Sequence, residues 1–431
     1  MDSIKLSFEG PLRGRIVLPA SKSISARALI INALSGNTIL PENLSDSDDT
    51  QAMLRALEDM PRCVDIGAAG TAMRFLTAYL SVTPGTRTLT GTERMKHRPI
   101  GILVDALRSI GADITYEGEE GYPPLRIVGR NDLEGGELTV AGNVSSQYVS
   151  ALLMIAPTLR KGLRLTLTGK VASRPYIDMT MSMMRDFGAE VEWKASPSRG
   201  GLEGAVIDVK PGAYLQRPYH IESDWSAASY WYEMVALAPR KANAEVELVG
   251  LHRNSIQGDS KVSQWMAELG VGTQHFVEPD GTEITRLRQT GNVTCYFCQD
   301  FTHQPDLAQT FAATCTMLDV PFRLVGLQSL RIKETDRIAA LEQELRKLAD
   351  VEVEGDELLW SGCYAEDMES LSGRMLTFDT YDDHRMAMAL APVCLRRAGQ
   401  IQINDPQVIT KSYPAYWDDL QKVGFKICRE Q

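Results

Sequence analysis

The stretch Gly67–Leu80, GAAGTAMRFLTAYL, carries the pattern that decides the fold: a Gly-containing turn runs into Ala, Met, Leu and aromatic residues. Such a run predicts a helix that is buried on nearly all sides. The pattern returns at residues 142–157 (GNVSSQYVSALLMIAP), 223–237 (SDWSAASYWYEMVAL), 303–317 (HQPDLAQTFAATCTM) and 381–395 (YDDHRMAMALAPVCL), and a sixth copy covers residues 21–34 (SKSISARALIINAL).

The first five copies recur at a steady interval, each beginning 75 to 81 residues after the previous one. Short β-prone runs lie between them, at residues 163–167 (LRLTL), 245–249 (EVELV) and 402–404 (QIN). A period near 80 exceeds the 20–50 residues of usual solenoid repeats, so each unit should hold several strands and more than one helix. The sequence therefore predicts an α/β protein built of repeated subdomains, with chance recurrence of amphipathic helices as the alternative.

The length of the chain limits the number of domains, and its charge limits the classes of partner that it can bind. The 431 residues predict two to four domains, with weak candidate breaks near Pro19–Ala20 and His220–Asp224. The net charge of −11 excludes a general attraction to nucleic acid or anionic membranes, so any anion site must be local. The seven cysteines form no disulfide framework, and no signal peptide or bilayer-length apolar run is present. We expect a soluble, cytoplasmic protein.

Basic residues nevertheless recur inside Ser- and Gly-rich turns before the predicted helices. Ser21–Arg27 (SKSISAR) combines hydroxyls, two cations and a helix start, and Gly67–Thr71 leads into a helix that carries Arg74. Backbone amides and the positive end of a helix dipole favour anions there. Arg94–Pro99 (RMKHRP) adds further cations. Capping serines with solvated cations are the alternative for each turn.

The C-terminal half shows similar signals. The stretch Arg331–Arg337 (RIKETDR) should open a helix on which Lys333 and Glu334 are both neighbours of Arg337. Asp382–Arg385 (DDHR) precedes an apolar helix, and Lys411 follows a short strand and a turn at Pro406. Only the accumulation of these modest signals favours an anionic ligand over solvated surface charge.

Metal and hydrolase chemistry find little support. Cys295 and Cys298 form a single Cys-x-x-Cys pair without a second one, His303 lies in a different setting, and no His-Glu-x-x-His or Gly-x-Ser-x-Gly motif occurs. We expect no metal site.

Ten motifs in this order cover nearly the whole chain: LPASKSISARAL, GAAGTAMR, TERMKHRPIG, GNVSSQY, SRPYID, RNSIQGD, PDLAQT, RIKETDR, DDHRMAMAL and ITKSYP. With them the chain closely resembles the 5-enolpyruvylshikimate-3-phosphate synthase family. The resemblance implies a two-domain enolpyruvyl transferase fold, each domain made of three similar βαβαββ-type subdomains. It implies one discontinuous domain of residues 1–19 plus 222–431, with the phosphoenolpyruvate-side residues, and a second of residues 20–221, with most shikimate 3-phosphate-binding residues.

The implied activity is transfer of the enolpyruvyl group of phosphoenolpyruvate to the 5-hydroxyl of shikimate 3-phosphate, releasing phosphate, on the route to chorismate and the aromatic amino acids. The family pattern implies a monomer without metal or organic cofactor, whose interdomain cleft closes on substrate through the crossings near residues 20 and 222. Glyphosate is expected to compete with phosphoenolpyruvate because Gly70 is small.

Site residues follow from the motifs that match. For shikimate 3-phosphate the resemblance implies Lys22, Ser23, Arg27, Ser145, Ser146, Gln147, Ser173, Asp306 and Lys333. For phosphoenolpyruvate it implies Lys22, Gly70, Arg94, Gln147, Arg337, Arg385 and Lys411.

Catalysis needs an acid and a base, because the methylene carbon of phosphoenolpyruvate gains a proton while the attacking hydroxyl loses one. The family pattern implies Glu334 as the proton donor and Asp306 as the base, with roles that can exchange, beside catalytic Lys22 and a supporting His384. Cationic clamps lower the cost of bringing two anionic substrates together.

Three residues depart from the family pattern: Ala68 replaces an Asn, Phe75 a Pro and Ser329 an Asn. They change residues of the phosphate loop and the residue expected to contact the shikimate phosphate, but they remove no charged group. Two alternatives remain: a UDP-N-acetylglucosamine enolpyruvyl transferase, whose reactive-loop Cys has no counterpart in TERMKHRPIG, and a catalytically silent anion-binding homologue.

Overall fold

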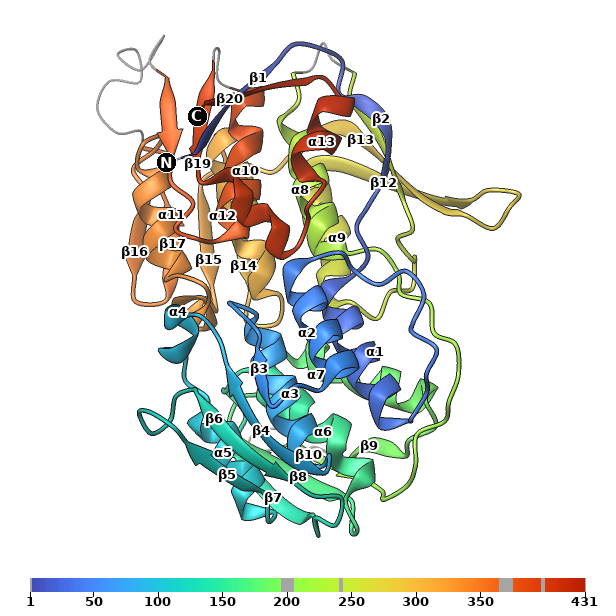
Figure 1. Cartoon of the computed structure of the whole chain (residues 1–431). Coiled ribbons are helices and arrows are strands. Elements are labelled where there is room, and N and C mark those ends of the chain that lie inside the picture. The colour runs from blue at the N-terminus through green and yellow to red at the C-terminus, as the bar shows by residue number, and fades with distance from the viewer. Residues whose placement is uncertain (1, 195–204, 240–242, 364–374, 397–399, 431) are drawn as a thin grey trace. The chain divides into compact units, whose positions relative to one another are not determined.

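The chain folds into two compact units, and the computed structural model describes residues 2–194, 205–239, 243–363, 375–396 and 400–430 (Figure 1). Unit 1 consists of Met1–Pro19 and Glu222–Gln431, and unit 2 of Ala20–Ile221. Both units combine four-stranded sheets with helices, which confirms the predicted α/β class.

Two sheets of unit 2 share one topology. The first holds β3 (Cys63–Asp65), β4 (Gly85–Thr90), β5 (Asp113–Tyr116) and β6 (Leu125–Gly129) in the order β3-β4-β6-β5. The second holds β7 (Gly136–Ala141), β8 (Leu163–Thr168), β9 (Val191–Lys194) and β10 (Ala205–Val209) in the order β7-β8-β10-β9. In each, the first two strands pair in parallel and the other pairs are antiparallel.

Unit 1 repeats this topology three times. One sheet has the order β12-β13-β11-β2, from β2 (Arg13–Val17), β11 (Glu245–Val249), β12 (Leu269–Val277) and β13 (Glu283–Val293). The next has the order β14-β15-β17-β16, from β14 (Phe297–Asp300), β15 (Phe322–Val325), β16 (Glu352–Glu354) and β17 (Glu357–Trp360). The last has the order β18-β19-β1-β20, from β1 (Ser3–Phe8), β18 (Leu376–Phe378), β19 (Ile401–Asn404) and β20 (Phe425–Glu430).

Each parallel strand pair is joined through one of the recurring helices. These are α3 (Gly70–Ser81), α6 (Ser146–Ile155), α8 (Trp225–Leu237), α10 (Ala308–Met317) and α12 (His384–Leu390). A second helix follows in each case: α5 (Gly101–Ser109), α7 (Arg174–Asp186), α9 (Val262–Glu268), α11 (Arg337–Leu345) or α13 (Tyr416–Lys422). The order βαβαββ runs without interruption in three subdomains, and this explains the period near 80 residues. In the other two, unit 2 separates β2 from α8, and N-terminal β1 takes the place of the final strand.

The sixth copy of the pattern is represented by helices. It comprises α1 (Lys22–Leu34), α2 (Asp48–Asp59) and an isolated parallel bridge between Glu42 and His220. Within the described part of unit 2, four-stranded sheets are present in the other two subdomains only.

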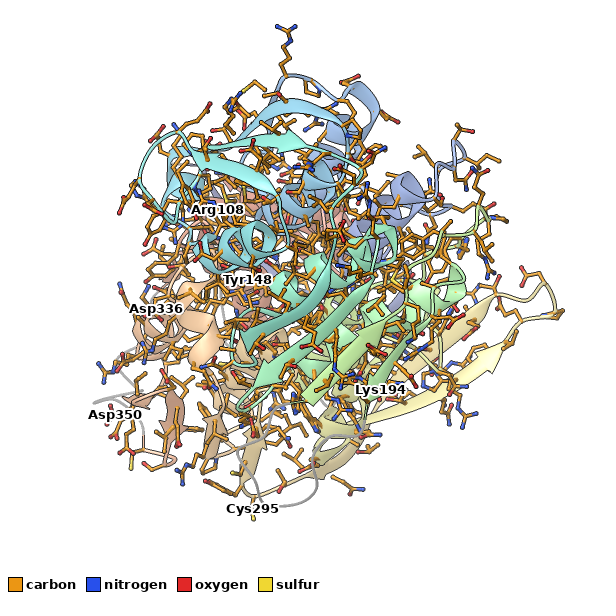
Figure 2. All side chains as sticks on the ribbon, turned by 90° about the horizontal axis from the view of Figure 1, so that it is seen from below. Arg108, Tyr148, Lys194, Cys295, Asp336 and Asp350 are labelled. Atoms are coloured by element: carbon orange, nitrogen blue, oxygen red, sulfur yellow. The ribbon has the colours of Figure 1, made fainter. Side chains whose placement is uncertain are left out.

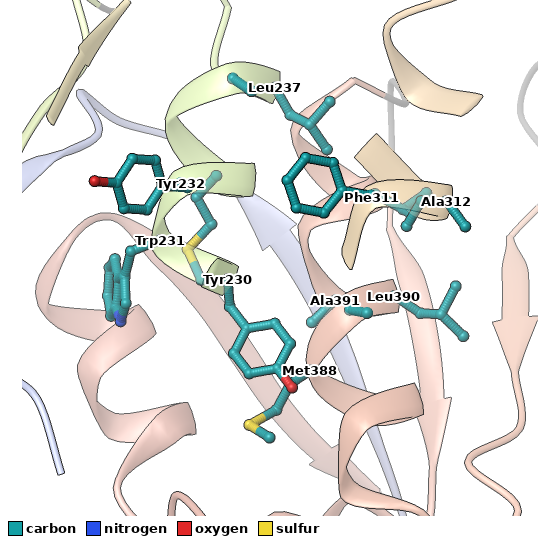
Figure 3. Packing of buried hydrophobic residues seen from close by; sticks show 14 of the residues in the cluster. Tyr230, Trp231, Tyr232, Leu237, Phe311, Ala312, Met388, Leu390 and Ala391 are labelled. Carbon is teal, nitrogen blue, oxygen red and sulfur yellow. The ribbon is translucent and has the colours of Figure 1, made fainter. Parts of the chain in front are cut away.

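The recurring helices form the centre of each unit because they are apolar on nearly every side. In unit 2, α1, α3 and α6 contact one another, and Figure 1 shows α3 lying along β4 and β6. In unit 1, α8, α10 and α12 contact one another, and Figure 3 shows Tyr230 and Leu237 of α8 near Phe311 of α10 and Met388 of α12. Every residue of α8 except Ser226 is buried.

Polar residues set where several of these helices begin. Ser145 caps α6 by accepting from Gln147 N, and Asp224 caps α8 by accepting from two backbone amides. Asp383 caps α12 in the same way. The motif residues at these starts are therefore held at the ends of rigid, buried helices. Among the described residues, no helix is long and apolar enough to cross a membrane.

The helix expected to open at Arg331–Arg337 begins later, which corrects the sequence prediction. Residues Gln328–Ile332 form a short 3₁₀ turn, η5, and α11 starts at Arg337. Asp336 ends the loop because its carboxylate accepts from the amides of Ile338 and Ala339 (3.1 and 3.2 Å). Lys333 is therefore not on a helix with Arg337.

Candidate functional site

Arg27 of α1 is a buried cation in unit 2. Its guanidinium donates to Thr180 Oγ1 (2.7 Å), Ser150 Oγ (3.1 Å) and the backbone oxygen of Ser23 (2.9 Å), all of which are neutral. Among the described residues, no ion pair joins Arg27 to a carboxylate. Burial lowers the pKa of Arg27 to about 10. An anionic ligand would supply the counter-charge that a buried cation requires.

The starts of α1, α3 and α6 bring other predicted residues together. Gln147 Nε2 donates to Thr71 Oγ1 (3.0 Å), so α6 is joined to the first turn of α3, where Gly70 lies. Ser145 and Ser146 lie at the start of α6. Lys22, at the first position of α1, lies 3.3 Å from Asp49 of α2.

Ser173 and Arg94 occupy different settings. Ser173 is buried, has a positive φ of 51° and directly precedes α7, whose Tyr176 carbonyl accepts from Arg27 (3.4 Å). Arg94 lies exposed on the short helix α4 (Glu93–Lys96). The guanidinium that packs against Gly70 belongs to Arg98 instead.

Arg337 organises the predicted residues of unit 1. It is only 1% exposed and donates to Asp383 Oδ2 (2.6 Å), Asp306 Oδ1 (2.9 Å) and Glu334 Oε2 (2.8 Å). Burial alone would lower the pKa of Arg337, but the three carboxylates outweigh it and raise the pKa. The ion pair with Glu334 confirms that the two residues are neighbours, although the helix begins only at Arg337.

Asp306 is the point where three cations meet. Arg385 Nη2 donates to Asp306 Oδ2 (2.9 Å), Arg337 to Oδ1, and Lys333 Nζ lies 3.5 Å from Oδ1. Burial alone would raise the pKa of Asp306, but the charges of Arg385, Lys333 and Arg337 hold it well below its usual range. The three cations therefore favour the ionised form of the Asp306 carboxylate.

The remaining predicted residues of unit 1 surround this cluster. Buried His384 has Nδ1 3.7 Å from Asp383 Oδ1, and Lys411 Nζ donates to the Asp382 carbonyl (2.8 Å). Lys411 ends the 3₁₀ turn η8 (Pro406–Lys411), which follows β19 as predicted. Arg385 also lies 3.4 Å from Tyr230 Oη, and burial raises the pKa of that phenol to about 12.

Sequence reasoning missed several groups that position these side chains. Asp383 lies in the DDHR motif, two residues before Arg385. This closeness in sequence was the one sign that Asp383 could contribute to the site. Asp259 of the RNSIQGD motif is buried and accepts from Ser226 Oγ. Burial and the charge of Asp306 raise the pKa of Asp259 to about 6. Asp49 lacked any local signal, because its partner Lys22 lies 27 residues away.

The three departures from the family pattern have different surroundings. Phe75 is fully buried, and the guanidinium of Arg27 lies 5.3 Å from the centre of its ring. Ala68 lies in the turn before α3, between Gly67, whose amide donates to Asp65, and Ala69. Ser329 lies half-buried in η5.

The described residues contain no group of three His, Cys, Asp or Glu side chains arranged to hold a metal ion. Cys295 and Cys298 are exposed thiols, and Figure 2 shows Cys295 on the outside of the protein. Most of the described candidate residues are cations or hydroxyl donors, which suit anionic organic substrates.

Comparisons with known proteins show the family of the chain. The family model described as EPSP synthase (3-phosphoshikimate 1-carboxyvinyltransferase) matches residues 7–64 and 60–420. A 3-phosphoshikimate 1-carboxyvinyltransferase of Bacteroides fragilis is 53% identical over 425 residues, covering 98% of each chain. The enzyme of that name from Photobacterium damsela subsp. piscicida is 36% identical over 450 residues, covering 98% of this chain and 100% of the relative.

A solved structure supports the fold. The EPSP synthase of Acinetobacter baumannii superimposes with a TM-score of 0.75 over 100% of both chains, at 20% sequence identity. Because the sequence relatives match along almost the whole chain, the identification does not depend on this structural likeness. The chain belongs to the EPSP synthase (3-phosphoshikimate 1-carboxyvinyltransferase) family.

Proposed function

We propose that this protein transfers the enolpyruvyl group of phosphoenolpyruvate to the 5-hydroxyl of shikimate 3-phosphate and releases phosphate. The observation that carries the proposal is the Asp306 cluster, where two carboxylates, Asp306 and Glu334, share the guanidinium of Arg337. An addition followed by an elimination requires such an acid and base.

In unit 2, the proposal assigns shikimate 3-phosphate to Lys22, Ser23, Arg27, Ser145, Ser146, Gln147 and Ser173, and phosphoenolpyruvate to Lys22, Gly70, Arg94 and Gln147. The buried guanidinium of Arg27 is suited to a phosphate because its protein acceptors are all neutral. Hydroxyls and an amide at the helix starts add donors to the same surface.

In unit 1, the proposal assigns phosphoenolpyruvate to Arg337, Arg385 and Lys411, and the reacting hydroxyl to Asp306 beside Lys333. An anionic substrate that draws on Arg385 and Arg337 would reduce the positive charge felt by Asp306. Since that charge holds the pKa of Asp306 down, substrate binding would raise its pKa and make it a stronger base. Glu334 would then deliver the proton to the methylene carbon, with His384 supporting the network.

The test is phosphate release from phosphoenolpyruvate plus shikimate 3-phosphate, with UDP-N-acetylglucosamine as the competing acceptor. We expect release with shikimate 3-phosphate only. Glu334→Gln should reduce kcat at least a hundredfold, the typical contribution of a general acid. Glu342→Gln, which makes the same change on α11 at a residue paired with Arg346, should leave kcat within twofold. Absence of turnover in folded protein would support the silent-homologue alternative.

A further inference from the structure

The guanidinium of Arg98 packs directly on the backbone of Gly70, the first residue of α3. A Cβ atom added to Gly70 would lie 2.8 Å from Arg98 Cζ and Nη2, and closer still to Nη1. These separations are shorter than real carbon contacts, so any side chain at residue 70 would displace Arg98. The absence of a side chain at Gly70 is therefore what allows Arg98 to occupy this position.

The backbone beside Arg98 is held firmly. The carbonyl of Pro99 accepts from Arg74 Nη2 (2.9 Å) and from Tyr148 Oη (2.6 Å), where Tyr148 is the residue labelled in Figure 2. On the other side, the amide of Arg98 donates to the Met95 carbonyl (3.0 Å). Arg74 and Tyr148 belong to the buried helices α3 and α6, so the central helices of unit 2 fix the start of the Arg98 side chain.

The side chain itself has no polar partner among the described residues. Its Nε atom is buried without an acceptor, and no hydrogen bond or ion pair to its guanidinium is found in that part of the chain. A guanidinium can donate five hydrogen bonds, so this one has unused donors at a partly buried place. Arg94 belongs to the same cationic stretch but is exposed, so the two arginines differ in their surroundings.

The first turn of α3 has the same need for negative charge. Within the described structure, the amides of Gly70, Thr71 and Ala72 have no acceptor, Ala69 supplies no capping side chain, and no acidic residue stands in that turn. A cation at a helix N-terminus is unfavourable unless an anion accompanies it. The Arg98 guanidinium and the first turn of α3 therefore place positive charge and unused donors next to each other.

We propose that Arg98 is a further binding residue for the phosphate group of phosphoenolpyruvate, acting with the first amides of α3, and that Gly70 provides the clearance for its guanidinium. The inference rests on the proposed function for the identity of the phosphate compound. It concerns residues of unit 2 alone, and it assigns the role to Arg98 in addition to Arg94.

The test compares Arg98→Ala, Arg98→Lys, Gly70→Ala and the Gly70→Ala/Arg98→Ala double variant. Arg98→Ala should raise KM for phosphoenolpyruvate about ten- to a hundredfold, the range of a charge-assisted hydrogen bond, and leave KM for shikimate 3-phosphate within twofold. Arg98→Lys should recover part of the loss. Arg87→Ala, which removes an arginine of β4 that donates to the Pro84 carbonyl, should leave both KM values unchanged.

The double variant separates clearance from direct contact. In the wild-type background, Gly70→Ala should raise KM for phosphoenolpyruvate. In the Arg98→Ala background, adding Gly70→Ala should change KM by less than threefold, because the guanidinium that it would displace is already absent. Equal effects in both backgrounds, or an Arg98→Ala KM within twofold of wild type, would overturn the proposal. Circular dichroism and Tm of each variant identify any that fail to fold, and Arg98→Lys then provides the comparison.

A binding measurement distinguishes failure of this inference from failure of the proposed function. Inorganic phosphate should raise the Tm of wild type and of Arg87→Ala, and the shift should be smaller in Arg98→Ala, in which Arg27 still offers a phosphate site. If phosphate protects through Arg98 but no turnover occurs, the anion role stands and the proposed activity fails. If turnover occurs and Arg98→Ala changes neither KM nor the phosphate shift, the activity stands and the role of Arg98 is refuted. No turnover and no shift in wild type would overturn both.

Discussion

Replacing Asp383 by Asn should destabilise unit 1 by about 3 kcal/mol, although the two side chains have nearly the same shape. Asp383 is fully buried, and it accepts from Arg337 through two atom pairs at 2.6 and 3.3 Å and from the amide of Arg385 at 2.9 Å. The Asn amide has one acceptor oxygen, so its NH₂ group must face one of these donors. The substitution therefore removes a charge and places donor against donor.

The magnitude follows from what remains around Arg337. Removing one partner of a buried ion pair costs about 3–5 kcal/mol. Asp306 and Glu334 still compensate the charge of Arg337, so the loss should lie at the lower end of that range. Asp383→Ala should cost roughly 1 kcal/mol more, because it also removes the N-cap of α12. The expected order of stability is wild type, then Asn, then Ala.

Urea titration followed by tryptophan fluorescence measures this directly, because five of the six tryptophans lie in unit 1. Asp382→Asn is the matched control: residue 382 is exposed and has φ of 55°, a conformation that Asn tolerates, so its midpoint should not move. An Asp383→Asn midpoint equal to wild type at equal m, or an Ala variant no less stable than Asn, would refute the view that this ion pair holds Arg337 in place.

Three further outcomes are expected. Phe75→Leu should lower the free energy of unfolding of unit 2, and the loss should be about 1–2 kcal/mol larger when Arg27 is present than in an Arg27→Met background. The difference arises because only the first case loses a desolvated cation–π contact. Equal losses in the two backgrounds of this double-mutant cycle would contradict the prediction. Asp259 has a pKa of about 6 when folded and near 4 when unfolded, so stability should fall by up to about 3 kcal/mol as pH rises from 4 to 6 and stay low above that. Asp259→Asn should flatten that part of the pH–stability curve, and an unchanged curve would rule the explanation out. Glyphosate should raise the apparent KM for phosphoenolpyruvate without lowering kcat, and initial rates unchanged by a large excess of glyphosate would count against competition at Gly70.

Local patterns in the sequence predicted the repeated architecture well. The run at Gly67–Leu80 became α3, the run at 223–237 became α8, and the β-prone run at 245–249 is β11. These predictions succeed because burial on all sides requires a continuous apolar helix, and such a helix is visible in the sequence itself. The short strands around them are less distinctive, which is why only some could be named.

The site was predicted mainly through motifs, and the exceptions have physical reasons. The sequence predicted that Glu334 and Asp336 both lie on a helix. The carboxylate of Asp336 instead caps α11, so the helix begins after it and Glu334 lies in the preceding loop. Arg94 and Arg98 are four residues apart in one cationic stretch, and composition does not distinguish them. Their environments differ because Arg98 packs on Gly70, a residue 28 positions earlier in the chain, and this contact is visible only in the structure.

The pairing of β1 with β19 and β20 bears on the order in which the chain folds as it is synthesised. Strand β1 begins at residue 3 and its partners begin at residues 401 and 425, so it lacks its sheet until almost all of the chain exists. Residues 20–221 are contiguous and contain their own buried helices and two complete sheets. The inserted unit can thus acquire its structure on the ribosome, while β1 waits for the last subdomain. Closure of unit 1 by β1 carries the entropy of a loop some 400 residues long.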